Sequence, residues 1–296
     1  MNNHRLWVHF SMILPPLFWA GNAVLGRFMA DALPPFAFSF WRWLIASLIL
    51  SPFALQGLYK YRAIIRQELP VLFLCAITSV SAYNSLLYLA LQSTTAINAT
   101  LVGASLPAMI PVIVWIWLGE RFSLKQGIGM LVSLGGVLLT ISSGDIFLLL
   151  RLELRQGDVL MLIATLAWAF YSVLLRKKPT KLPILVFLAF ISWIGMPFIF
   201  PLYAWEMGNG KFIAFNLANS LAIFYVGLFP SVLAYIFWNK GIEKLGPTTA
   251  GHYYYLVPVL AAFLAVLLLD EPLRWFHPTA LLLILLGITI ANRRSK

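Results

Sequence analysis

The sequence predicts an all-α polytopic membrane protein with ten transmembrane helices, arranged as an inverted repeat of two five-helix halves. Three observations predict this fold: the composition, a regular succession of apolar stretches, and an internal repeat. Of the 296 residues, 61% are hydrophobic and only 10% are charged, whereas soluble domains are about half apolar and a quarter charged. We therefore expect the chain to fold in the lipid bilayer.

The apolar stretches are each about 17 to 23 residues long, enough to cross a hydrocarbon core of about 30 Å as a helix. Clusters of charged residues, glycines and prolines separate them. The predicted spans are residues 8–30, 36–55, 69–91, 95–117, 124–142, 157–176, 182–203, 219–239, 247–269 and 276–292. The single cysteine, Cys75, lies inside one span, so we expect no disulfide, no metal site and no cofactor.

The basic residues predict the orientation of the chain. Fifteen of the 21 Lys and Arg residues fall in the segments that are cytoplasmic if both termini are inside, and five fall in the opposite segments. This asymmetry follows the positive-inside rule, so we expect a multi-pass protein of the cell inner (plasma) membrane with both termini cytoplasmic. The net charge is +11, but the basic residues lie in short loops between apolar spans. They do not form a basic stripe on a water-exposed fold, which argues against a nucleic-acid partner.

An internal repeat relates the two halves of the chain. Matching residues recur in the same order 149 to 154 positions apart: Trp19 and Trp168, Thr95 and Thr249, Pro107 and Pro258, and Glu120 and Glu271. Because each half holds five predicted spans, an odd number, the second half enters the membrane from the opposite face. Chance similarity between apolar helices is the alternative explanation.

Several short motifs resemble the EamA-type exporters of the drug/metabolite transporter superfamily. They are Phe18-Trp19-Ala20-Gly21-Asn22, the Arg42 of Phe40-Trp41-Arg42-Trp43-Leu44, and the Leu118-Gly119-Glu120 that follows a proline-containing span. The resemblance implies two EamA-type repeats, residues 1–145 and 146–296, around a central cavity, and export of amino acids or related metabolites by alternating access. One departure is Asp270-Glu271-Pro272, where the first half has Gly119-Glu120-Arg121.

Candidate substrate-binding residues are the polar and aromatic side chains within the spans, because a polar group in lipid is costly unless it faces protein or water. Trp and Tyr also gather in belts at membrane interfaces, which accounts for others near the span ends. The candidates are Trp19, Asn22, Arg42, Tyr83, Asn84, Asn98, Trp168, Tyr171, Tyr235, Trp238, His252 and Tyr255. Such a lining would suit a zwitterionic or aromatic metabolite.

Arg42 is a strongly basic residue well inside an apolar span, where a charge costs at least about 2.5 kcal/mol unless it is paired or hydrated. One interpretation is that it reaches toward the interface and hydrogen-bonds helix ends near Trp41 and Trp43. The other is that its guanidinium group attracts a substrate carboxylate. Glu271, beside Arg274, is expected to form a helix-end ion pair or gate.

Prolines and glycines predict moving and packing points. Pro107 and Pro258 interrupt helix hydrogen bonding at equivalent places in the two halves and are candidate hinges or fixed kinks. Gly129, Gly135 and Gly136, together with Gly287 of the last span, are expected to allow close approach of helices, as small residues do in membranes.

The sequence thus predicts a transporter, and specifically an exporter, of small metabolites, with amino acids or related compounds favoured. A channel, a membrane sensor, or a transporter of nucleosides or drugs remains the alternative. No zinc motif, acidic pair or nucleophile with a base predicts an enzyme. His252 is the titratable candidate at depth, so we expect facilitated transport or exchange rather than proton-driven pumping. The oligomeric state is not predicted.

Overall fold

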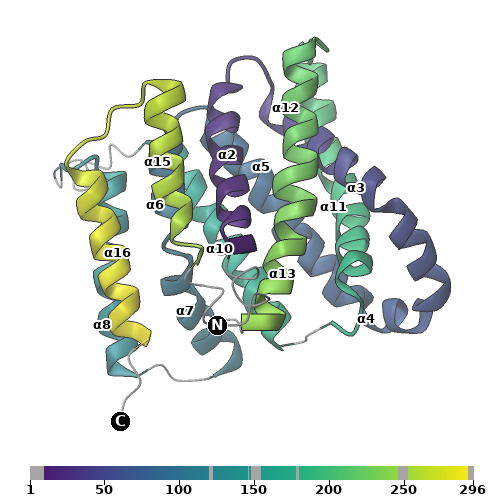
Figure 1. Cartoon of the computed structure of the whole chain (residues 1–296), viewed down its shortest axis with the longest axis horizontal. Helices are drawn as coiled ribbons and strands as arrows, with labels where there is room; N and C mark the ends of the chain where they lie inside the picture. Colours follow the sequence, from purple (N-terminus) through teal and green to yellow (C-terminus); the bar gives the residue numbers. More distant parts are fainter. Residues whose placement is uncertain are drawn as a thin grey trace.

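The computed structural model describes residues 10–119, 123–145, 147, 155–177, 180–245 and 253–292, and these residues form helices and connecting turns without strands. The helices are α2 (Leu14–Phe28), α3 (Pro35–Lys60), α4 (Arg62–Cys75), η1 (Ala76–Ala82), α5 (Tyr83–Ala90), α6 (Ala96–Gly103), α7 (Leu106–Leu118), α8 (Leu124–Ile141), α10 (Gln156–Lys177), α11 (Ile184–Gly208), α12 (Leu217–Leu228), η2 (Phe229–Leu233), α13 (Ala234–Leu245), α15 (Leu256–Leu269) and α16 (Phe276–Asn292). Figure 1 shows them side by side, with the two chain ends on the same side.

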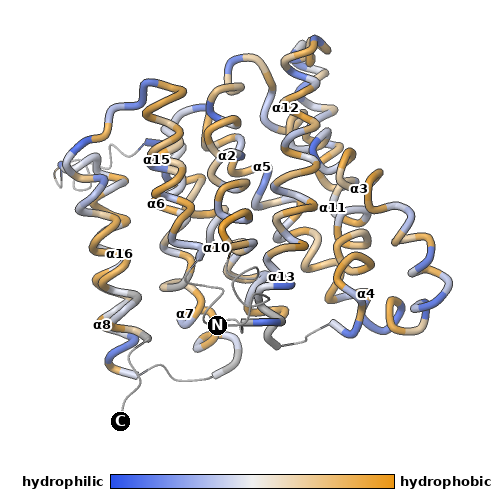
Figure 2. Tube along the Cα trace, viewed as in Figure 1, coloured by the Kyte–Doolittle hydropathy of each residue, from blue (hydrophilic) through white to orange (hydrophobic). Residues whose placement is uncertain are grey.

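The helices have the length and composition of a membrane protein. Within the described ranges, six continuous helices are long and apolar enough to cross a bilayer, and the bent pair α6–α7 raises the number to seven. Figure 2 shows that hydrophobic residues occupy the bodies of the helices, while hydrophilic residues gather at their ends and in the connections. The fold is therefore all-helical and of the membrane type.

Several helices extend further than hydrophobicity alone predicts, among them α3 and α4. Helix α3 continues to Lys60, beyond the expected end at residue 55, and α4 begins at Arg62 instead of residue 69. The added turns carry exposed polar and basic side chains. Lys and Arg are good helix formers, so the helix persists after the apolar stretch has ended.

Two helix ends that the predicted repeat matches share a backbone conformation. Gly119 ends α7 with φ 71°, and Asp270 ends α15 with φ 53°. Both angles lie in the left-handed region, which glycine adopts freely and aspartate tolerates better than most residues. The change from glycine to aspartate at this position therefore preserves the cap. Glu120 and Arg121, which follow Gly119, lie outside the described residues.

Helix α6 ends where a bend begins. Residues Ala96–Gly103 and Ala108–Trp117 differ in direction by 44°, and Pro107 lies in the first turn of α7. In the second half a turn at residues 254–255 precedes α15, which carries Pro258 in its first turn. A proline lacks the amide hydrogen, so it is tolerated at such a helix start. The hinge role of the two prolines stays a prediction.

Helices α8 and α16 pack closely through glycines. A Cβ atom on Gly129 would lie 2.3 Å from the Gly287 carbonyl oxygen, and one on Gly136 would lie 2.7 Å from the Ala280 carbonyl oxygen. These residues are the close-approach points that the sequence predicts. Gly135 is not, because a Cβ atom there meets no atom within 4 Å: it projects from a different face of α8.

Replacing Gly129 with alanine is therefore expected to force α8 and α16 apart and to destabilise the protein by about 2 kcal/mol, as overpacking of a filled interface does. Thermal melting of the purified protein would measure the loss. Gly135→Ala is the matched control, since it adds the same methyl group to open space and improves helix propensity. Equal melting temperatures for the two variants would contradict this account of the interface.

Candidate functional site

Aromatic rings from both halves of the chain meet inside the helix bundle. The ring of Trp19, on α2, lies 6.3 Å from Tyr235, 5.2 Å from Trp238 and 5.8 Å from Tyr254, measured between centroids. Tyr235 and Trp238 belong to α13, and Tyr254 lies in the turn before α15. One face of α2 therefore contacts two segments more than 200 residues away in the chain.

A second tryptophan completes this cluster from α10. The Trp168 ring lies 4.7 Å from Tyr83 on α5, 5.1 Å from Tyr171 and 6.0 Å from Tyr235. We call these seven residues the aromatic cage: Trp19, Tyr83, Trp168, Tyr171, Tyr235, Trp238 and Tyr254.

Short π-helical segments position the cage. Segment η1 directly precedes Tyr83, and η2 directly precedes α13, whose second residue is Tyr235. A π turn leaves backbone carbonyl groups without their usual helical partners. In η2, the Pro230 carbonyl oxygen accepts a hydrogen bond of 3.2 Å from Trp19 Nε1, which fixes the orientation of the indole ring.

Several rings of the cage are only partly buried. Tyr171 and Tyr235 are 7% and 5% exposed and form its wall, while Trp19, Trp168 and Tyr254 are half-buried. Aromatic faces bind other rings by offset or edge contacts and attract cations through their negative faces. Ring faces of this kind suit a small molecule with an apolar, aromatic or cationic part.

Arg42 is buried beside the cage, with 3% of its surface exposed. Its Nε donates to Ser231 Oγ at 2.6 Å. One terminal nitrogen, NH1, donates to Asn22 Oδ1 at 3.2 Å and to the Tyr88 hydroxyl at 3.1 Å, and that hydroxyl donates to Asn22 Oδ1 at 2.7 Å. The guanidinium group thus joins α2, α3, α5 and η2.

The surroundings of Arg42 explain how a charge is tolerated there. Hydroxyl and amide oxygens bind the guanidinium group, and the Trp43 and Tyr88 rings lie 5.4 and 5.9 Å from its central carbon. Cation–π contacts and charge-assisted hydrogen bonds replace part of the lost hydration. With these partners Arg42 holds four helical segments together, while attraction of a substrate carboxylate stays a prediction.

The structure separates the other candidates from the cage. Asn84 donates to the Ser79 carbonyl oxygen of η1 at 2.7 Å, so it stabilises the π turn. Asn98 lies in a polar pocket described below, and Tyr255 packs against a neighbouring hydrophobic core that includes Met161. His252 lies outside the described residues.

Sequence reasoning missed Ser231. The pattern also indicates Tyr88 and Tyr254 as aromatic groups within the spans, although neither is among the twelve candidates. Tyr254 takes the place expected for Tyr255, because the turn at residues 254–255 prevents extrapolation of the helical phase. One available signal was the repeat itself. Tyr235 follows Tyr83, and Ser231 follows Ser79, by 152 positions, within the range of the other matches.

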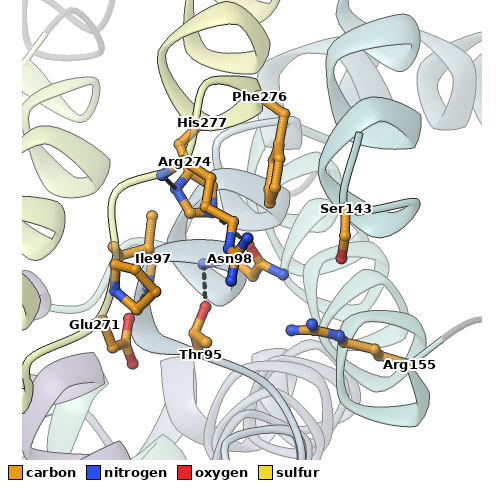
Figure 3. Close-up of a pocket in the computed structure, with 10 residues that line it drawn as sticks. Thr95, Ile97, Asn98, Ser143, Arg155, Glu271, Arg274, Phe276 and His277 are labelled. Carbon is orange, nitrogen blue, oxygen red and sulfur yellow. Dashed lines mark hydrogen bonds between the residues drawn. The ribbon is translucent and has the colours of Figure 1, made fainter. Parts of the chain in front are cut away.

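A polar pocket lies at the other end of α15 from the cage. It is a cavity of about 360 Å³ (Figure 3). Its lining residues are Thr95, Ile97, Asn98, Ser143, Arg155, Glu271, Pro272, Arg274, Phe276 and His277. Figure 1 shows the α15–α16 connection, which contributes Glu271 and Arg274, on the side opposite the chain ends.

A buried hydrogen-bond network forms one wall of the pocket. The Asn98 side chain donates to Asp158 Oδ2 at 3.4 Å, and Thr94 Oγ1 donates to Asp158 Oδ1. His277 Nδ1 accepts from the backbone N–H of Arg274 at 3.0 Å, so Nε2 carries the proton of the neutral ring and donates to Asn98 Oδ1 at 3.2 Å. Each group fixes the orientation of the next.

Glu271 caps a helix of the other half of the chain and does not pair with Arg274. Its carboxylate accepts hydrogen bonds from the backbone N–H groups of Ala96 and Ile97, at 2.8 and 3.1 Å. These groups lack partners within α6 because they lie in its first turn. Glu206 at the end of α11 binds Ala37 N–H in the same way, at 2.7 Å.

Glu271→Gln is expected to lower the free energy of unfolding by about 1–2 kcal/mol. The amide nitrogen cannot accept a hydrogen bond, so one backbone N–H of α6 loses its partner, and the favourable charge at the helix start is lost. Thermal melting would measure the change. Asp31→Asn, the same loss of charge at an exposed position, serves as the control. A melting temperature equal to that of the wild type would show that Glu271 is not a cap.

Comparison with known proteins gives matches over nearly the whole chain. The model of the EamA-like transporter family matches residues 6–142 and again residues 155–293. An uncharacterized transporter of Archaeoglobus fulgidus is 28% identical over 289 residues, which cover 97% of this chain and 98% of that protein. A "Probable terminal-alkyne amino-acid exporter" of Streptantibioticus cattleyicolor is 25% identical over 292 residues, covering 97% and 93%.

A solved structure, described only as "Crystal structure of protein", has a similar fold. Its TM-score is 0.64 at 22% sequence identity, and the match covers 97% of this chain and 95% of that one. At this identity the similarity concerns the fold alone.

Proposed function

Because the chain belongs to the EamA-like transporter family, and is thus a multi-pass membrane transporter and not an enzyme, we propose that it exports amino acids or related small metabolites by alternating access through the aromatic cage. The observation that carries this proposal is that rings from both halves of the chain form the cage. A site between two halves is exposed alternately to each side when the halves rock against each other. Its small-molecule substrate and lipid surroundings follow from the family.

The proposal includes ten membrane crossings in two inverted repeats, residues 1–145 and 146–296. The six long helices, the bent α6–α7 pair, and the shorter α2, α15 and α16 together supply ten. The two matches to the family model support a repeat. So does the packing of α3 against α11 and of α8 against α16, since each pair joins a helix to its counterpart.

The cage has the same pseudo-symmetry. Trp19 and Trp168 are counterparts, and so are Tyr83 and Tyr235. The contact between Trp19 and Tyr235 therefore corresponds, under the pseudo-symmetry, to the contact between Trp168 and Tyr83. Such equivalence favours two related states of similar energy, as alternating access requires.

An amino acid or relative with an apolar side chain fits the cage chemistry. The exporter of Streptantibioticus cattleyicolor is named for an amino acid with an alkyne group, which is apolar and electron-rich. Aromatic faces would bind such a side chain. Nucleosides and drugs are the competing substrate classes, and a channel is the competing mechanism.

The proposed location is the cell inner membrane with both termini cytoplasmic, as the distribution of basic residues favours. Energy coupling is proposed to be facilitated transport or exchange. The cage residues are aromatic and hold no carboxylate among the described side chains.

A substrate panel tests the proposal. Purified protein is screened with amino acids, nucleosides and cationic drugs for a raised melting temperature, since a ligand of the folded state stabilises it by mass action. Each hit is then tested by counterflow in proteoliposomes. Saturable counterflow of an amino acid supports the proposal, whereas ohmic current without saturation would establish a channel. Counterflow restricted to nucleosides would overturn the substrate class.

A further inference from the structure

The polar pocket is separate from the cage. Helix α10 contributes to both, with Asp158 behind the pocket wall and Trp168 in the cage. At a rise of about 1.5 Å per residue, these two positions lie about 15 Å apart along the helix. The pocket is also built from both halves, since α6 supplies Asn98 and the start of α16 supplies His277.

The pocket presents positive charge to its cavity. Arg155 precedes α10, Arg274 precedes α16, and both side chains are exposed. Figure 3 shows the two guanidinium groups pointing into the cavity from different elements, toward Asn98. The two positively charged guanidinium groups repel each other across the cavity, and an anion bound between them removes this repulsion.

The acidic groups of this region are already engaged. Glu271 is 7% exposed, and both of its carboxylate oxygens accept backbone N–H groups of α6. Asp158 is 0% exposed and accepts hydrogen bonds from Thr94 and Asn98. The groups left to meet a solute in the cavity are therefore mainly the arginine donors.

We propose that this pocket is a second binding site, an outer vestibule that holds the carboxylate group of an organic solute between Arg155 and Arg274. Guanidinium groups bind carboxylates through parallel N–H donors, which suits a planar anion. The volume of about 360 Å³ accommodates a molecule of the size of an amino acid. Asn98 and His277, fixed by their network, form a rigid polar floor.

The cage and the vestibule lie toward opposite ends of α15, since Tyr254 precedes this helix and Glu271 follows it. A solute that leaves the cage toward the end opposite the chain termini would meet Arg155 and Arg274 before it reaches solvent. This role rests on the proposed transport function, but binding to the pocket does not. Binding is therefore tested without transport.

The test uses the purified full-length protein and titrates propionate while thermal melting is followed at constant ionic strength. Propionamide, the uncharged molecule of nearly the same shape, is the ligand control. Propionate is expected to raise the melting temperature and propionamide to leave it unchanged. Arg155→Gln and Arg274→Gln are each expected to weaken the fitted propionate affinity about tenfold or more, as loss of charge-assisted hydrogen bonds does.

Matched variants locate the effect. Arg66→Gln removes the same charge from an exposed position on α4, a helix that contributes no residue to the pocket lining, and is expected to retain the propionate response. Arg274→Lys keeps the charge but not the planar donors, so its affinity should fall between those of wild type and Arg274→Gln. The melting temperature of each variant without ligand shows that it is folded.

Three results would overturn the vestibule. The first is that propionate leaves the melting temperature of the wild type unchanged. The second is that propionate raises the melting temperature of the double variant Arg155→Gln/Arg274→Gln as much as that of the wild type, and the third is that inorganic phosphate binds as tightly as propionate. The last result would indicate a general anion site. If the protein shows saturable counterflow but propionate does not raise its melting temperature, the vestibule alone is rejected and the transport proposal stands. A propionate response without counterflow would reject the transport proposal and keep the pocket.

Discussion

Replacing Arg42 with lysine is expected to lower the free energy of unfolding by about 3 kcal/mol. Lysine keeps the buried charge, and so keeps its desolvation cost, but its single nitrogen cannot bond Ser231 and the Asn22–Tyr88 pair from the two positions that Arg42 uses. Each lost hydrogen bond to a charged group is worth about 1.5–3 kcal/mol. Thermal melting of the purified protein would measure the effect.

Arg66→Lys is the matched control for this prediction, because Arg66 is exposed on α4 and the same chemical change there should leave stability nearly unchanged. If Arg42→Lys has the same melting temperature as the wild type, the guanidinium group is not the connection between α2, α3, α5 and η2. The position would then be open to the alternative role, contact with a substrate carboxylate.

Trp168→Ala is expected to weaken the apparent affinity for the transported solute about thirtyfold or more, which corresponds to about 2 kcal/mol. Trp168 contacts Tyr83, Tyr171 and Tyr235 at centroid distances of 4.7 to 6.0 Å. Its removal opens the cage on the side of α10. Concentration dependence of counterflow in proteoliposomes, using the solute identified by the panel, would give the affinity.

Trp205→Ala is the control, because Trp205 is 59% exposed on α11 and its loss should leave affinity unchanged. Trp168→Phe keeps an aromatic face and is expected to recover most of the affinity. If Trp168→Ala transports with the wild-type affinity, the cage is a packing cluster and the substrate path lies elsewhere.

Much of the helical framework could be predicted from the sequence. A helix that crosses lipid must satisfy its own backbone hydrogen bonds, so apolar length alone indicates it. Helix α8 and helix α16 were expected at residues 124–142 and 276–292, and they occupy Leu124–Ile141 and Phe276–Asn292. The π segments were not predicted, because one extra residue in a turn changes no hydrophobic period in a span that is apolar on all sides.

The candidate site was predicted in part, for a related reason. Trp19, Trp168, Tyr83 and Tyr235 were chosen as aromatic residues within the spans, and the structure brings their rings together. The position of a residue within a span indicates how deep in the membrane it lies. It does not indicate which side of the helix the side chain faces. Asn98, for example, is a buried polar residue of α6 that lines the polar pocket and not the cage.

The two π segments constrain how the chain length can change during evolution. Deleting one residue from η1 or η2 would restore regular α-helix and turn every later residue of that span by about 100°. Tyr83, or Tyr235 and Trp238, would then face lipid while all side-chain identities remained the same. Single-residue deletions in these seven- and five-residue segments should therefore be far less tolerated than substitutions there.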